Sequence, residues 1–247
     1  MSAFVLKIIA CVSMLLDHIG FQYGILAFRY IGRLAFPIYL FLIYNGFRHT
    51  SNPLRYALRL GLFAVVSQIP FSLCFFHTLW YFTGNVMFTL LAALLCLWVA
   101  DLMSKHRWLK WISIVPFLVM FIAYHRHILW TEYGAIAMLM MLVLFLFGDG
   151  TGFRKALLGV GLAVAMNYSH ILAIAKNILR GNGQILPSLS QGELIQLFAI
   201  VAIPLILLYN GKKGMPQSGK TAARLQQYGF YLFYPMHLLL LWLIGLL

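Results

Sequence analysis

The sequence predicts an all-α fold, a polytopic bundle of about nine transmembrane helices, within a range of eight to ten. Three observations support this. Of the 247 residues, 63% are hydrophobic and only 9% are charged, whereas a soluble domain is about half apolar and about a quarter charged. Apolar runs close to the ~20 residues that cross a bilayer recur along the chain. The period-2 alternation of barrel strands is absent. A soluble globular protein and a disordered chain are therefore excluded.

The apolar runs follow one another through short connections and predict one membrane domain over residues 1–247. The second run is short and contains Pro37, which predicts a kink or tilt there. Nine runs qualify by length, at residues 4–27, 31–46, 56–76, 84–103, 109–124, 133–147, 155–175, 193–209 and 229–247.

The positive charge predicts topology rather than a nucleic-acid partner. There are 18 Lys and Arg residues against 5 acids, a formal charge of +13. Twelve of the 18 lie in or next to the connections after even-numbered spans, and five in or next to those after odd-numbered spans. Because cytoplasmic loops carry the excess of Lys and Arg, this bias predicts a cytoplasmic N-terminus. The three cysteines lie in apolar runs without metal-ligand spacing, so no metal is expected.

Asp17 and His18 lie together well inside the first span. Ionisable residues at membrane depth are costly and generally mark a site. Neighbouring residues do not share a helix face, so Asp17 is not expected to orient His18 directly. We expect the two side chains to point to different partners around one cavity. The alternative is a structural pair in which Arg33 compensates the charge of Asp17.

Further candidates for binding a substrate or donor are polar residues at membrane depth or at span ends. Each has a structural alternative: snorkelling or a positive-inside loop for an arginine, interhelical hydrogen bonding for an amide, and the helix dipole for an acid. By topology, most of them should meet in the middle to outer half of the bundle, whereas two lie at the cytoplasmic end of the second span. These candidates are Arg33, Asn45, Arg48, Gln68, Asn85, Glu132 and His237.

Two functional classes fit such a cavity. In a membrane-embedded transferase, an imidazole would act as general base, and arginines and amides would bind phosphates or an oxyanion. In a small-solute or proton-coupled transporter, the same groups would form a relay. The lack of inverted repeats and of paired broken helices disfavours transport. A structural subunit of an envelope complex is a third possibility.

Seven short stretches resemble the TraX family of bacterial membrane proteins. Two of them are Val-Ser-Met-Leu-Leu-Asp-His-Ile-Gly at 12–20 and Ile-Gly-Arg-Leu-Ala-Phe-Pro at 31–37. The resemblance covers nearly the whole chain. The remaining stretches are Gly46–Arg48, Ser67–Pro70, Asn85–Leu90, Tyr133–Gly134 and Phe233–Leu238.

The resemblance implies an acetyltransferase of the bacterial cytoplasmic (inner) membrane that uses acetyl-CoA. The founding member of the family is associated with F-type conjugation and N-acetylates a pilin. The closing Tyr-Pro-Met-His is also similar to membrane acyltransferases that O-acetylate sugars. By this resemblance His18 is expected as general base, Asp17 as a supporting acid, and Arg33 and Arg48 as contacts to CoA phosphates or substrate. Direct transfer and an acetyl-histidine intermediate both remain open, as does the acceptor, a peptide, pilin or envelope glycan.

Overall fold

The computed structural model describes residues 1–180, 191–214 and 220–245. Over these residues the fold is all-α, so the predicted fold class is confirmed. The helices are α1 (Ala3–Tyr23), α2 (Leu26–Gly32), α3 (Ala35–Arg48), α4 (Pro53–Phe76), α5 (Val86–Ser104), α6 (Val115–His125), α7 (Gly134–Phe147), α8 (Phe153–Met166), α9 (Tyr168–Leu179), α10 (Gln191–Leu197), α11 (Ala202–Leu207) and α12 (Lys220–Gly245).

Membrane-spanning length is reached by fewer segments than the nine predicted. Within the described part of the chain, five segments are long and apolar enough to cross: α1, α2 with α3, α4, α5 and most of α12. The pair α8 and α9 is bent by 71° and would add a sixth span. The other three apolar segments form shorter helices, over Lys110–His125, Gly134–Phe147 and Leu194–Leu207. The chain is thus a multi-pass membrane protein with five to six spans by length, and the count of nine is not confirmed.

The first two spans are shaped by local backbone chemistry. The first helix ends before Gly24, whose φ of 70° is the left-handed conformation that glycine adopts readily at a helix end. The second span is broken between α2 and α3, at Arg33 and Leu34. Pro37 lies in the first turn of α3, where a missing N–H costs nothing. The expected irregularity is present, but it lies just before the proline.

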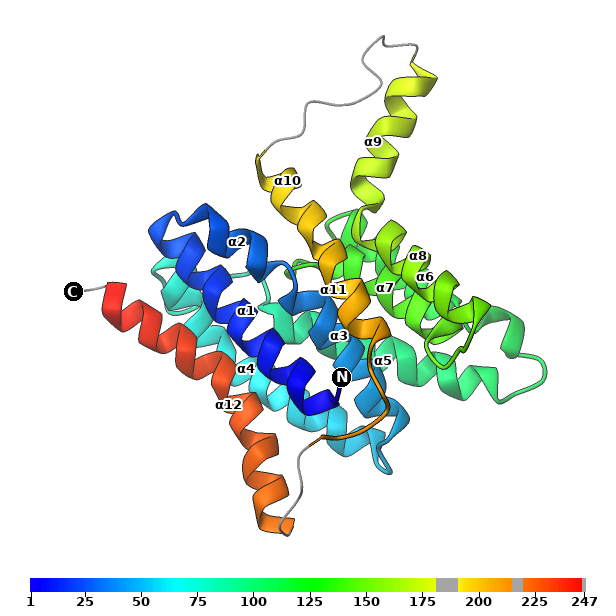
Figure 1. The fold of residues 1–247 in the computed structure, drawn as a ribbon, viewed down its shortest axis with the longest axis horizontal. Coiled ribbons are helices and arrows are strands. Elements are labelled where there is room, and N and C mark those ends of the chain that lie inside the picture. Colours follow the sequence, from blue (N-terminus) through cyan, green and yellow to red (C-terminus); the bar gives the residue numbers. More distant parts are fainter. Residues whose placement is uncertain (181–190, 215–219, 246–247) are drawn as a thin grey trace.

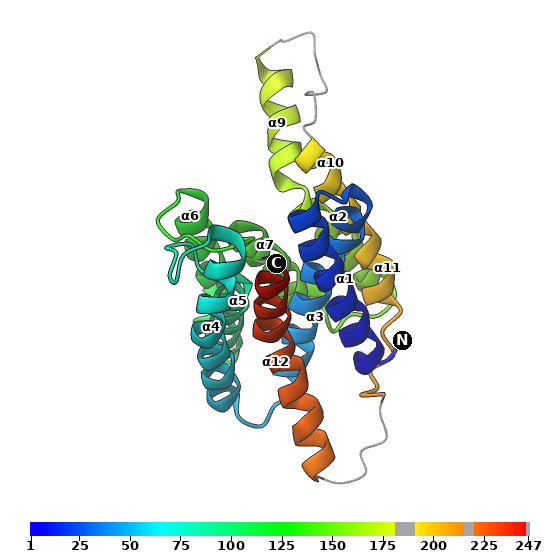
Figure 2. The same ribbon diagram turned by 90° about the vertical axis from the view of Figure 1, so that its left-hand side faces the viewer.

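The first and last helices pack together, although they are far apart in sequence. Helix α1 packs against α2, α3 and α12, and α12 also packs along α4 (Figure 1). The N-terminus and the start of α12 lie toward one end of the bundle, while α9 extends from the opposite end (Figure 2). The Lys/Arg bias assigns the former end to the cytoplasm, and this orientation stays a prediction.

Candidate functional site

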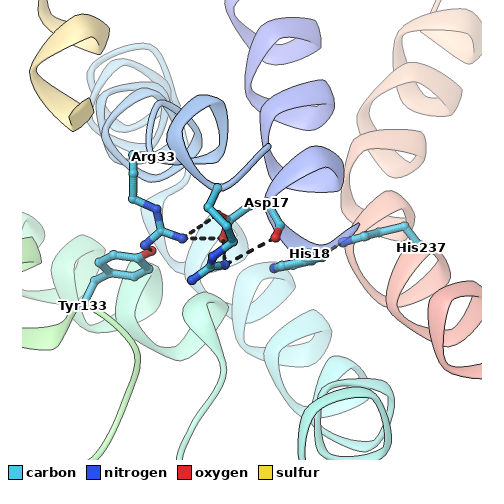
Figure 3. A network of polar contacts seen from close by, with 6 residues as sticks. Asp17, His18, Arg33, Tyr133 and His237 are labelled. Atoms are coloured by element: carbon cyan, nitrogen blue, oxygen red, sulfur yellow. Dashed lines mark hydrogen bonds and ion pairs between the residues drawn. The ribbon is translucent and has the colours of Figure 1, made fainter. Parts of the chain in front are cut away.

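An ion cluster joins α1 to the break between α2 and α3. Asp17 is 8% exposed. Nη2 of Arg33 lies 2.5 Å from both oxygens of its carboxylate, and Nη1 of Arg29 lies 3.0 Å from Oδ2. Nη1 of Arg33 also donates to the Tyr133 hydroxyl at 2.5 Å (Figure 3). One buried carboxylate therefore holds two guanidiniums against α1, which is the charge compensation that formed the structural alternative for Asp17.

Gly32 makes this close approach possible. A Cβ added at Gly32 would overlap with the side chain of Asp17. The Gly-Arg pair in the stretch 31–37 therefore has a structural explanation. Gly32 leaves room for the Asp17 carboxylate, and the next residue, Arg33, binds it.

His18 points away from this cluster and meets His237 on α12. Nδ1 of His18 lies 2.7 Å from Nε2 of His237 (Figure 3). Nδ1 of His237 lies 2.7 Å from the carbonyl oxygen of Phe233. Asp17 and His18 thus have different partners, as the sequence predicted. His237 is buried and His18 is half-buried.

These two distances determine where the protons of a neutral histidine pair lie. A carbonyl oxygen accepts only, so Nδ1–H of His237 donates to Phe233. Nε2 of His237 is then an acceptor, and Nδ1–H of His18 donates to it. Nε2 of His18 is left with its lone pair, which is the form in which an imidazole takes a proton.

Glu132 lies in the connection between α6 and α7, outside the membrane-spanning helices. The hydroxyl of Thr89 donates to its backbone carbonyl at 2.5 Å. Burial raises the pKa of the Glu132 carboxyl to about 7, and the nearby Arg33 guanidinium acts against that rise. The next residue is Tyr133, the hydrogen-bond partner of Arg33, so this connection borders the ion cluster.

Replacing Glu132 with Gln is expected to stabilise the protein more at about pH 8 than at about pH 5. An acid whose pKa is raised on folding holds its proton more tightly in the folded state. The contribution of Glu132 to the free energy of unfolding is greatest below its ordinary pKa of 4.5 and is lost as the pH rises toward about 7. Thermal unfolding of both proteins at the two pH values measures this. Asp149→Asn, at a half-exposed side chain, is the control. A difference in stability between Glu132→Gln and wild type that does not change with pH would contradict the raised pKa of Glu132.

The two amide candidates are engaged within the protein. Nε2 of Gln68 donates to the carbonyls of Tyr81 and Thr83, each at 3.0 Å. Nδ2 of Asn85 donates to Oε1 of Gln68 at 2.9 Å and to the Ala64 carbonyl at 2.8 Å. Asn85 is also the N-cap of α5. This geometry agrees with the structural alternative for amides, interhelical hydrogen bonding, because the two side chains fix the α4–α5 connection against α4.

Arg48 and Asn45 lie at the far end of α3 from the ion cluster. Arg48 pairs with Asp149 at 2.6 Å and with Asp101 at 3.6 Å. Nδ2 of Asn45 donates to the Tyr209 hydroxyl at 3.1 Å. Helix α3 begins two residues after Arg33 and ends at Arg48, and its fourteen residues span about 21 Å at ~1.5 Å per residue. The two arginines therefore cannot contact the same small group.

A pocket of about 570 Å³ lies between the ends of α1, α3, α4 and α12. Its deep end is lined by Met14 and Tyr234, which lie one helical turn before His18 and His237 respectively. The buried hydroxyl of Tyr234 has no hydrogen-bond partner among the described residues. The opposite part of the pocket is lined by the cations Lys7, Arg59 and Lys213.

Of the residues that line this pocket, sequence reasoning selected Asn45 as a binding candidate. Lys7 and Arg59 lie inside the predicted spans 4–27 and 56–76, and a charge within a span was the signal that could have marked them as site residues. Tyr133 was missed as the partner of Arg33. Tyr234 belongs to the closing Tyr-Pro-Met-His stretch, but only the packing of α12 brings it to the pocket. Lys213 carried no signal of its own.

Together these features define a class: a polytopic helical membrane protein with a histidine pair, a buried aspartate–arginine cluster and a pocket at one end of the bundle. The chain belongs to the TraX family, since the family model described as TraX protein matches residues 2–245. It is 31% identical to the probable fimbrial assembly protein FimC, serogroup H1, of Dichelobacter nodosus, over 97% of this chain and 94% of that protein. No solved structure matches the chain.

Proposed function

We propose that this protein is a membrane-embedded acetyltransferase that moves an acetyl group from acetyl-CoA to an amine or hydroxyl of a peptide, pilin-like or envelope acceptor. The observation that carries the proposal is the His18–His237 pair. The chain Phe233–His237–His18 leaves Nε2 of His18 free, and two guanidiniums lie on the other side of α1 at Asp17. A neutral imidazole near neutral pH is the usual general base for such nucleophiles.

In the proposed reaction, Nε2 of His18 takes the proton of the acceptor amine or hydroxyl as that group attacks the thioester carbonyl carbon. A C–N or C–O bond forms, the C–S bond breaks, and the leaving thiolate receives the proton from the His18 imidazolium. His237 accepts the hydrogen bond from His18 Nδ1–H throughout, which stabilises the imidazolium. The cluster of Asp17, Arg29 and Arg33 carries a net positive charge across α1 from His18, and this charge favours the developing oxyanion at a distance.

Asp17 has a different role in this proposal from the supporting acid implied by the family resemblance. Both of its oxygens are bound by guanidiniums. It therefore keeps Arg29 and Arg33 at the site rather than exchanging protons. The name of the Dichelobacter nodosus relative, a probable fimbrial assembly protein, supports a pilin-like acceptor.

The purified protein in lipid nanodiscs is expected to release CoA thiol from acetyl-CoA and to acetylate an added pilin-type peptide in equal amounts. Thiol titration and mass spectrometry of the peptide measure the two products. Empty nanodiscs and a peptide with a blocked N-terminus are the controls, and a soluble glycan tests a hydroxyl acceptor.

The transporter alternative is tested with the same preparation. Discontinuous helices are typical of transporters, and the bent α8–α9 pair is the observation that favours this class. Solute flux into proteoliposomes without dependence on acetyl-CoA, together with no acetylated product, would overturn the acetyltransferase.

A further inference from the structure

We infer that the pocket between α1, α3, α4 and α12 binds the phosphate groups of an elongated ligand through Lys7, Arg59 and Lys213. The phosphate site follows from the pocket alone. That its ligand is a soluble acyl-CoA rests on the proposed function.

The first argument is the distribution of charge. The three described aspartates that form ion pairs do so elsewhere: Asp17 pairs with Arg29 and Arg33, while Asp101 and Asp149 pair with Arg48. Among the described residues that line the pocket there is no acid. The cations there therefore have no carboxylate within the pocket. An anion of at least two charges is the complementary ligand.

The second argument is that two of these cations are held by aromatic rings, which position a charge without neutralising it. Nζ of Lys7 lies 5.1 Å from the ring centre of Phe230. The guanidinium of Arg59 lies 5.9 Å from the ring centre of Tyr56, and its Nε is buried without a hydrogen-bond partner. The guanidinium of Arg59 also lies close to the side chain of Tyr231. A bound phosphate oxygen would satisfy the remaining guanidinium donors.

The third argument is the shape of the pocket. Lys7 and Met14 both line it and are seven residues apart on α1, as are Gln227 and Tyr234 on α12. At ~1.5 Å per residue, either separation corresponds to about 10 Å. The walls between are apolar, with Leu42, Leu60 and Leu90.

A lone phosphate would occupy the cationic part of this pocket and leave the apolar part empty. A ligand with phosphates at one end and a thin chain at the other would occupy both. Its far end would reach the unpartnered Tyr234 hydroxyl, one turn from His237. An acyl-CoA has this shape and charge, and so does an anionic phospholipid.

Arg59→Gln is expected to weaken CoA binding about tenfold, whereas Arg55→Gln is expected to leave it within about twofold. Arg55 is the matched control because it lies one turn earlier on α4, is exposed and does not line the pocket. Calorimetric titration of the protein in zwitterionic nanodiscs with CoA measures binding without turnover. Pantetheine, which lacks the phosphates at the far end of CoA, should bind equally to all three proteins. Lys7→Gln and Lys213→Gln repeat the test if Arg59→Gln does not fold.

Nanodiscs that contain phosphatidylglycerol distinguish the two sources of phosphate. If the lipid is the ligand, it displaces CoA from the wild-type protein, and the displacement is lost in Arg59→Gln. That result keeps the phosphate site and overturns the acyl-CoA assignment.

Equal CoA affinity of Arg59→Gln, Lys7→Gln, Lys213→Gln and wild type would overturn the phosphate site. CoA binding that depends on Arg59 without any acetyl transfer would keep the site and reject the proposed function. If acetyl transfer is found but its KM for acetyl-CoA is the same in Arg59→Gln and Arg55→Gln, the proposed function is kept and the phosphate site is rejected.

Discussion

Replacing His18 with Gln is expected to lower the rate of acetyl transfer by about a hundredfold or more, with little change in CoA binding. A positioned general base contributes about 10²–10⁴ in rate, and Gln has no basic nitrogen. The rate of CoA release in the presence of acceptor measures the loss. His106→Gln is the control, because His106 is exposed and lies beyond the end of α5. Undiminished transfer by His18→Gln would show that another residue is the base.

A series at His237 tests whether this residue positions the proton of His18. Gln at this position still offers an acceptor oxygen to Nδ1–H of His18, whereas Leu fills a similar volume but offers none. We expect Leu to lower kcat about tenfold or more and Gln to restore most of it, with KM for acetyl-CoA unchanged. The pH profile of kcat should also shift in the Leu variant, because the His18 imidazolium loses its hydrogen-bond partner. Equal activity of the two variants would mean that His237 serves packing alone.

Replacing Asp17 with Asn is expected to cause the largest loss of stability of any single polar substitution discussed for this chain. The side chains of Arg33 and Arg29 are only 10% and 24% exposed. Removing their shared carboxylate leaves two like charges close together in a poorly solvated place. Breaking a buried ion pair on one side costs about 3–5 kcal/mol. Thermal unfolding in detergent or nanodiscs measures this through the melting temperature.

Asp149→Asn provides the comparison for Asp17→Asn. Asp149 also pairs with an arginine, at 2.6 Å, but both side chains are about half exposed. Exposed ion pairs contribute about 0–1 kcal/mol. A double variant, Asp17→Leu with Arg33→Leu, should recover part of the loss, because both buried partners are removed together. An Asp17→Asn protein that keeps its stability and loses only transfer would return Asp17 to the role of a supporting acid.

The prediction of transmembrane helices and the choice of candidate site residues followed from local properties of the chain. Apolar runs and the scarcity of charge predict transmembrane helices because lipid cannot solvate polar side chains. The same reasoning singled out Asp17 and His18, and the rule that adjacent residues do not share a helix face predicted their separate partners. The number of spans was less accessible, since several apolar runs form helices too short to cross a bilayer unaided.

The partners of these residues could not be read from composition or spacing. His18 and His237 are 219 residues apart, and their contact depends on the packing of α12 beside α1. Arg48 shares its motif with Gly46 and looked like a donor contact, but it is neutralised by Asp101 of α5 and by Asp149 of the α7–α8 connection. Gln68 and Asn85 looked like site residues, yet they satisfy each other and nearby carbonyls.

The sequence alone therefore established a helical membrane protein with ionisable residues at depth, because both properties depend on the free energy of each side chain in lipid. The tertiary structure decided which of these residues are available for chemistry. Availability depends on whether a neighbouring helix supplies a counter-charge or a hydrogen bond. Asp17, Arg33 and Arg48 have such partners. Among the described residues, Nε2 of His18 is left without a hydrogen-bond partner and the cations of the pocket without a carboxylate.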